Sequence, residues 1–227
     1  MNNLAIIPAR SGSKRVKNKN IIIYKNRPLL YWTIKAAKET GLFSCIHVST
    51  DCFKIKKIAE KFGADVSFLR SVSLSDDKTA VDKVTLDTIL KFKKLKNKEF
   101  ANVVQLMPNC PLRNSSDIQK HYNYFIKNKK KIQISCMQAL GSNSWWSFYY
   151  YKKKVIKLYP DAFKKRSQDL PKLFTPSGAI WIANVNKLLK KKSFYNKETT
   201  YYPISWIGGF DIDTLDDLEL LNKLNIK

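Results

Sequence analysis

The first 135 residues alternate short apolar runs with segments of helical spacing, and this alternation limits the chain to few architectures. The apolar runs predict strands at residues 3–8, 45–49, 66–69, 102–106 and 132–137. The intervening segments predict helices at residues 28–40, 53–62, 82–95 and 116–126, the last capped by Ser115 or Ser116. Strands and helices that alternate in this way form βαβ units, so we expect an α/β fold with three layers and a mostly parallel sheet. Ligands of such sheets bind beyond the carboxyl ends of the strands.

Length and composition favour one folded domain. The chain has 227 residues, of which 44% are hydrophobic, enough for one α/β domain with an appended piece. No apolar stretch approaches the ~20 residues that span a bilayer, and residues 4–7 enter a strand-like run without a signal peptide. We therefore expect a cytoplasmic protein with no membrane contact. The four cysteines form no C-x-x-C pair and there are two histidines, a poor basis for a zinc site.

The net charge of +24 raises nucleic-acid binding as an alternative function. Lysines, however, are scattered through every predicted helix rather than gathered in one patch. This distribution makes nucleic acid an improbable partner, while the field of the whole chain still attracts anionic substrates.

Residues 6–20, IIPARSGSKRVKNKN, carry the densest functional signal. The first predicted strand ends at Pro8, a turn containing Gly12 follows, and five cations fall within ten positions: Arg10, Lys14, Arg15, Lys17 and Lys19. Backbone N–H groups of such a turn can point at an anion, and the cations add charge there. The segment has neither a P-loop nor a dinucleotide pattern, so the residues alone leave open a triphosphate site and a solvated basic face.

The same string resembles the opening signature of the acylneuraminate cytidylyltransferases, the CMP-sugar synthetases, which has the form x-I-P-A-R-x-G-S-K-x-x-x-x-K-N. The matching residues are Pro8, Ala9, Arg10, Gly12, Ser13, Lys14, Lys19 and Asn20. The resemblance implies a Rossmann-like nucleotidyltransferase that transfers CMP from CTP to the anomeric hydroxyl of a nonulosonic acid of the N-acetylneuraminate type. It also implies catalytic charge stabilisation by Arg10, Lys14 and Lys19, and nucleotide binding by Ala9, Arg10, Ser11, Gly12, Ser13 and Asn20.

Asp211 and Asp213 form a D-x-D motif near the end of the chain. In an extended strand the two carboxylates would face one side, about 7 Å apart, and could hold Mg²⁺ against a triphosphate. D-x-D alone is often only a polar turn. Thr214 and Asp217 predict a capping box for a helix over 215–224. The string F-D-I-D-T-x-x-D-L-E-L resembles the family's C-terminal motif, which implies that Asp211 and Asp213 bind the metal and that Asp211 is catalytic.

Two central motifs also resemble the family. Arg70 opens a segment similar to L-R-P-x-x-L-x-x-D, with Ser71 in place of proline, and the resemblance implies that Arg70 contacts the nucleotide. Residues 105–113, QLMPNCPLR, resemble L-Q-P-T-S-P-L-R, with Met107 where a glutamine usually helps to position the substrates. A thioether lacks the donors of an amide, so Met107 leaves the sugar open, and Gln105 on the same side of the strand is a candidate replacement.

Residues 145–151 contain six aromatic side chains in seven positions, followed by Lys152 to Lys154 and by a possible second arm of a hairpin at 155–159. A nucleic-acid stacking platform and a hairpin packed on another surface both fit, and we favour packing. Residues 166–171, RSQDLP, resemble the family's R-x-Q-x-L-P block. The resemblance implies one cytidylyltransferase domain over 1–227, a dimerisation excursion at about 140–175, and a homodimer in which Arg166 and Gln168 contact the sugar.

Three alternatives stay open. The first is the same reaction on pseudaminic, legionaminic or 3-deoxy-octulosonic acid. The second is a basic nucleic-acid-binding protein. The third is a non-catalytic relative that binds nucleotide only, because Ser71 and Met107 depart from the family pattern.

Overall fold

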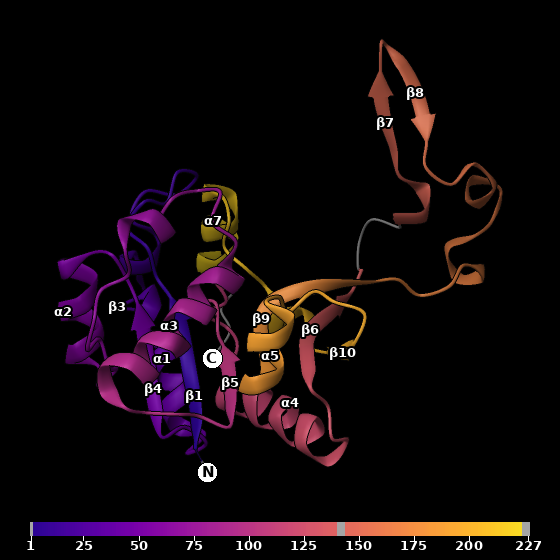
Figure 1. Ribbon diagram of the computed structural model, residues 1–227. Coiled ribbons are helices and arrows are strands. Elements are labelled where there is room, and N and C mark those ends of the chain that lie inside the picture. Colours follow the sequence, from indigo (N-terminus) through magenta and orange to yellow (C-terminus); the bar gives the residue numbers. More distant parts are fainter. Residues whose placement is uncertain (1, 140–143, 224–227) are drawn as a thin grey trace.

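A six-stranded sheet lies at the centre of the computed structural model, which describes residues 2–139 and 144–223 (Figure 1). Its strand order is β10-β6-β9-β5-β1-β4, where β1 is Asn3–Pro8, β4 is Cys45–Ser49, β5 is Asn102–Gln105, β6 is Ile132–Gln138, β9 is Phe174–Asn184 and β10 is Thr199–Pro203. β1 pairs in parallel with β4 and β5, and β10 pairs in parallel with β6. β9 runs antiparallel to both β5 and β6. The mostly parallel α/β sheet is confirmed, and one antiparallel strand is inserted in its middle.

Alternating residues of β1 show how the three layers form. Ala5 and Ile7 pack into one buried cluster with side chains from α1 (Leu29–Glu39), α2 (Phe53–Lys61) and α4 (Ser115–Lys127). Leu4 and Ile6 point to the opposite face, into a cluster with α3 (Val81–Lys96) and α5 (Val185–Lys191). A strand that is apolar on both faces must be covered on both, so the sequence pattern dictates helices on each side.

A third, smaller cluster fixes the C-terminal segment beside the end of β1. It joins Tyr24 of the β2–β3 ribbon (Ile23–Tyr24 and Arg27–Pro28) to Phe210, Ile212 and Leu221. The segment comprises α6 (Trp206–Gly209) and α7 (Leu215–Lys223), and residue 224 of the predicted final helix lies outside the described residues. This packing places residues 210–221 beside residues 24–29, which follow the basic turn.

Two local predictions are wrong. Residues 66–69 form no strand; a single bridge between His47 and Asp65 takes the place of a ladder. The Asp65 carboxylate accepts hydrogen bonds from the Ser67 N–H and hydroxyl, and this turn diverts the chain from β4. The cap of α4 is Asn114 rather than a serine, because its side chain accepts from the Asp117 N–H at 3.0 Å and Asp117 accepts in return from the Asn114 N–H.

A hairpin arm projects away from the sheet between β6 and β9 (Figure 1). It consists of β7 (Phe148–Tyr151) and β8 (Lys154–Lys157), paired antiparallel as the sequence predicts, followed by 3-10 turns at Pro160–Lys164 and Ser167–Asp169. Tyr149, Tyr150 and Tyr151 are 50%, 72% and 59% exposed, so in a single chain the aromatic run is uncovered. The first residues of the predicted excursion, 140–143, lie outside the described residues.

Within the described residues, no helix has the length and apolar character needed to cross a bilayer.

Candidate nucleotide site

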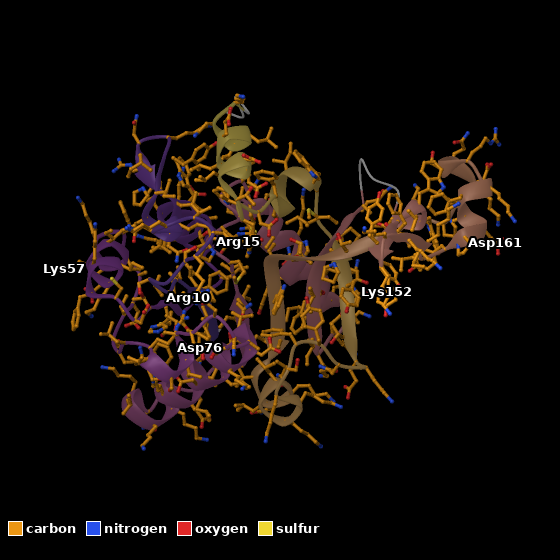
Figure 2. All side chains as sticks on the ribbon, turned by 90° about the horizontal axis from the view of Figure 1, so that it is seen from above. Arg10, Arg15, Lys57, Asp76, Lys152 and Asp161 are labelled. Carbon is orange, nitrogen blue, oxygen red and sulfur yellow. The ribbon has the colours of Figure 1, made fainter. Side chains whose placement is uncertain are left out.

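A cavity of about 490 Å³ opens beyond the carboxyl ends of β1 and β5. Figure 2 places Arg10, Arg15 and Asp76 together over the main body, far from Lys152 and Asp161 on the arm. Predicted site residues in the cavity wall are Arg10, Ser13, Lys14, Lys19, Asn20, Arg70, Met107 and Asp213. Further wall residues include Pro8, Arg15, Leu74, Asp76, Asp77, Thr79, Val81, Val84, Pro108 and Asn109. The basic turn, the loop after Arg70 and the C-terminal segment therefore surround one space.

Hydrogen bonds to neighbouring residues hold the turn after β1. The Ala9 N–H donates to the Ser49 carbonyl at 2.9 Å, and the Asn20 side-chain amide donates to the Arg10 carbonyl at 2.9 Å. The Ser11 N–H and hydroxyl both donate to the Asp51 carboxylate, at 2.8 and 2.7 Å. The Ser11 N–H therefore points at an anion of the protein itself, the Asp51 carboxylate, and its predicted contact with the nucleotide stays a prediction.

The neighbours of Ser11 have different surroundings. Ala9 is fully buried, Ser13 donates its N–H to the Ser11 carbonyl, and a Cβ added at Gly12 would meet nothing within 4 Å. Ser13 belongs to the cavity wall, whereas Ala9, Ser11 and Gly12 do not. The positive side chains of the wall come from both sides of this turn, Arg10 before it and Lys14, Arg15 and Lys19 after it.

Two carboxylates tie these cations across the cavity. Asp77 pairs with Arg10 at 2.7 Å and with Lys14. Asp213 pairs with Arg15 and with Lys19, both at 3.0 Å. Lys19 also donates to the Ile212 carbonyl at 2.9 Å, and its side chain is 16% exposed. Four cations from one turn therefore converge on two anions that come from distant parts of the sequence.

Asp211 and Asp213 lie in an irregular segment between α6 and α7, so the predicted strand is absent there. Ile212 between them is fully buried, and its N–H donates to the Asn109 carbonyl at 2.9 Å. Asp213 lines the cavity, whereas Asp211 is half-buried and is not among the wall residues. The predicted capping box is present, because Asp217 accepts from the Thr214 N–H at 2.7 Å and Thr214 Oγ1 accepts from the Asp217 N–H at 3.2 Å.

Burial, followed by the nearby charge of Asp213, raises the pKa of Asp211 above its usual value. Asp211 forms no salt bridge among the described residues, in contrast to Asp213. No group of three or more His, Cys, Asp or Glu side chains in the described residues is placed to hold a metal. Two carboxylates with one uncompensated charge nevertheless fit a hard cation that takes its remaining oxygen ligands from substrate phosphates and water.

Arg70 is anchored beneath the cavity. It is 7% exposed, and its guanidinium donates to the Ser49 hydroxyl at 3.1 Å and to the Ser49 carbonyl at 2.5 Å. Burial lowers the pKa of Arg70 to about 10, which leaves the group charged at neutral pH. This fixed charge sits at the start of the loop that carries Asp76 and Asp77.

Two residues at the end of β5 are candidates for contact with the sugar. Gln105 is fully buried, and its side-chain oxygen accepts from the Thr85 hydroxyl at 2.6 Å, so Gln105 is absent from the cavity wall. Met107 does line the cavity, and a Cβ added at Gly178 would lie 3.2 Å from Met107 Cγ. As the alternation of a strand predicts, Gln105 lies on the same side as Met107, and its side-chain nitrogen is 4.0 Å from the Met107 sulfur while Thr85 of α3 holds its oxygen. A contact of Gln105 with the sugar stays a prediction.

Two contacts near this site escaped the sequence reasoning. Asn109 lines the cavity, its amide approaches Asp213 at 3.5 Å, and its carbonyl accepts the Ile212 N–H. Arg113 is fully buried and donates to the Met107 carbonyl at 3.1 Å and to the Ala179 carbonyl at 2.8 Å. Both residues belong to the QLMPNCPLR motif, whose spacing was the available signal.

Arg166 and Gln168 lie on the arm, in and beside the 3-10 turn Ser167–Asp169, and do not line the cavity of their own chain. The Arg166 guanidinium makes a two-point contact with the Asp169 carboxylate, at 2.8 and 3.1 Å. A role for these residues in a partner's site stays a prediction.

Comparisons with known proteins agree with this geometry. A family model described as Cytidylyltransferase matches residues 4–225. The chain is 31% identical to a pseudaminic acid cytidylyltransferase of Campylobacter jejuni, over 99% of this chain and 98% of the relative. It is 32% identical to a CMP-N,N'-diacetyllegionaminic acid synthase of Legionella pneumophila, over 97% of this chain and 95% of the relative.

A solved CMP:2-keto-3-deoxy-manno-octonic acid synthetase complexed with CTP has the same fold, with a TM-score of 0.71 over 99% of this chain and 98% of that one, at 13% identity. The predicted family, fold class and type of enzyme are confirmed. The chain belongs to the cytidylyltransferase family, among its CMP-sugar synthetases, and is a CTP-dependent nucleotidyltransferase.

Proposed function

We propose that the protein transfers CMP from CTP to the anomeric hydroxyl of a nonulosonic acid and releases pyrophosphate. The observation that carries the proposal is the cavity at the end of β1, where four cations of one turn pair with the Asp77 and Asp213 carboxylates and Arg70 lies in the same wall. Such a cavity suits a triphosphate beside a pair of carboxylates, which is what the transfer of a nucleotidyl group requires.

Each part of the wall has a role in this proposal. The hydroxyl oxygen attacks the α-phosphorus in line, the α–β phosphoanhydride bond breaks, and the hydroxyl proton passes to solvent. Lys19, Arg10 and Lys14 stabilise the charge on the departing pyrophosphate. Ser13, Asn20 and Arg70, which line the cavity, would help to hold the nucleotide, and Met107 in the same wall would contact the sugar.

Enzymes of this family typically use a divalent metal ion, and we propose Mg²⁺. Asp211 and Asp213 would hold it, and when bound it would neutralise the α-phosphate and make the attacking hydroxyl more acidic. Lys19 and Arg15 each pair with Asp213 at 3.0 Å, so this carboxylate is held in place in the cavity wall.

The acceptor proposed first is an N-acetylneuraminate-type acid. Pseudaminic or legionaminic acid is the second candidate, because relatives named for these acids match over nearly their whole length. Met107 leaves the choice between them open, since its thioether lacks the hydrogen-bond donors that an amide offers to a hydroxyl.

A homodimer completes the proposal. The exposed aromatic run on the arm leaves apolar area that a second copy would cover, and Arg166 does not line the cavity of its own chain. We place the enzyme in the cytoplasm, where CTP is available.

A pyrophosphate-release assay with CTP, Mg²⁺ and a panel of acids tests the reaction. The panel contains N-acetylneuraminic, pseudaminic, legionaminic and 3-deoxy-octulosonic acid. Turnover with one of the first three supports the proposal. Salt-sensitive binding of DNA or RNA, without turnover of any acid, would favour the nucleic-acid alternative instead.

Mixing two inactive variants tests whether sites are shared between protomers. Arg166→Ala and Asp213→Asn should each abolish most turnover as homodimers. In a mixed dimer, the protomer that carries Arg166→Ala keeps Asp213, and its partner supplies an intact Arg166 to that site. Exchange of protomers between the two folded variants should therefore restore activity. No restoration, although mixed dimers form, would place Arg166 outside the partner's site.

A further inference from the structure

Asp77 occupies the cations that the proposed function assigns to phosphate. Its carboxylate pairs with Arg10 at 2.7 Å and with Lys14, and all three residues line the cavity. Arg10 and Lys14 are exposed by 31% and 80% in their side chains, so both are accessible to a ligand from solvent. A phosphate that approaches them meets donors already taken by a carboxylate.

The loop that bears Asp77 is shaped to present it. Asp76 accepts hydrogen bonds from the Lys78 and Thr79 N–H groups at 3.0 and 2.6 Å, which closes a turn around Asp77. Ser75 donates its hydroxyl to the Ser71 carbonyl at 3.0 Å, and its own carbonyl lies 3.4 Å from the Arg10 guanidinium. The loop is thus docked on the basic turn through Arg10, with the carboxylate aimed at the cavity.

The Asp77 carboxylate is charged and partly exposed, so an anionic ligand can replace it at its two cations. Hydrogen bonds from Lys14 and Arg10 lower the pKa of Asp77 below its usual value, so the group is a full anion at neutral pH. Its side chain is 35% exposed, and pairs of this kind are individually weak. A pyrophosphate group carries more charge than one carboxylate and outcompetes it for the same two cations.

We propose that Asp77 is a displaceable internal anion, which positions Arg10 and Lys14 in the empty site and competes with pyrophosphate for them. The inference rests on the proposed function, because it takes these cations as pyrophosphate ligands. When CTP binds, its phosphates displace Asp77; after transfer, the carboxylate returns to the cations and favours departure of the product. Asp77 acts through Arg10 and Lys14 and is a positioning residue.

Titration of the full-length protein with inorganic pyrophosphate, followed by calorimetry in magnesium-free buffer, tests the competition. Asp77→Asn keeps the size of the side chain and removes the competing charge, so its Kd for pyrophosphate should fall by about threefold to tenfold, the range expected from two partly exposed ion pairs. The inhibition constant of pyrophosphate against CTP should fall by a similar factor. Asp161→Asn removes an equally negative side chain, 91% exposed on the arm, and should leave both constants unchanged.

A double-mutant cycle separates competition from a general field effect. In a Lys14→Met background, the gain from Asp77→Asn should shrink, because one of the two contested cations is gone. Asp77→Glu should keep pyrophosphate binding closer to wild type than Asp77→Asn does.

Unchanged or weaker pyrophosphate binding by Asp77→Asn would overturn the inference, and so would a gain that persists fully without Lys14. Failure of the wild-type protein to bind either pyrophosphate or CTP would overturn the proposed function itself, so the two failures are distinct.

Discussion

The loop at residues 71–80 and the segment at residues 210–217 make the same contact with the basic turn, yet they are built differently. Asp77 and Asp213 each pair with two cations of that turn. Asp213 follows a fully buried Ile212, and its backbone N–H donates to the Asp217 carboxylate at 2.9 Å. Asp77 lies in a loop whose tether to the basic turn is the Arg10 side chain, beside the turn closed by Asp76.

The difference shows that an ion pair does not by itself define a role. Asp213 is held through its own backbone, by the buried Ile212 before it and the helix cap after it, in addition to its two cations. Asp77 stands on an exposed loop, where an incoming anion replaces it at little cost. The first arrangement suits a metal ligand, and the second suits a group that leaves when the substrate arrives.

The largest expected difference is between Asp213→Asn and Asp77→Asn. Asp213→Asn should lower kcat by about 10²- to 10³-fold, because an amide is a poor ligand for Mg²⁺ and transition-state charge is left less neutralised. Asp211→Asn should act similarly. Asp77→Asn should keep kcat within about tenfold of wild type.

Steady-state kinetics across a Mg²⁺ titration checks this ordering. Excess Mg²⁺ should partly restore kcat in the Asp211 and Asp213 variants and should leave kcat of the Asp77 variant unchanged. Equal losses at Asp77 and Asp213 would show that the two carboxylates share one role.

The sequence predicts some parts of the fold and not others. The strand–helix alternation predicted the sheet and its two helical layers, because apolar periodicity follows directly from burial. It could not give the direction of β9, which depends on where the chain returns after the arm. The strand predicted at 66–69 failed because the Asp65 carboxylate captures nearby N–H groups, a contact that periodicity does not encode.

The candidate site shows the same division. The motifs predict that Arg10, Lys19, Arg70 and Asp213 share one site, and in the structure all four line the same cavity. They missed the attachment of Ser11 to Asp51 and of Gln105 to Thr85, since both partners lie far away in sequence. Asp77 was visible as a motif position, but its pairing with the basic turn required the loop to be folded.

The next largest effect is expected at the lysines that pair with the two carboxylates, Lys19 with Asp213 and Lys14 with Asp77. Lys19 is 16% exposed and is fixed by the Ile212 carbonyl and Asp213, whereas Lys14 is 80% exposed. Lys19→Met should lower kcat/KM by about 10²-fold, the loss typical of a preorganised donor. Lys14→Met should lose less than about tenfold, mostly in the KM for CTP, as for an exposed ion pair. Kinetics at saturating acceptor measures both, and a larger loss at Lys14 would reverse the comparison.

The smallest expected effect probes the support behind Asp213. Thr214→Ala removes the hydroxyl that accepts the Asp217 N–H and donates to the Asp217 carboxylate, so the free energy of unfolding should fall by about 1 kcal/mol. Because Asp217 also accepts the Asp213 N–H, loosening the cap should weaken the apparent affinity for Mg²⁺ as well. Thr214→Ser retains the hydroxyl and serves as the control.

Denaturant unfolding and a Mg²⁺ titration of activity measure the two effects. If stability falls while the Mg²⁺ dependence stays that of the wild type, the cap holds α7 but does not position Asp213, and the contrast with Asp77 rests on Ile212 and Asn109 instead.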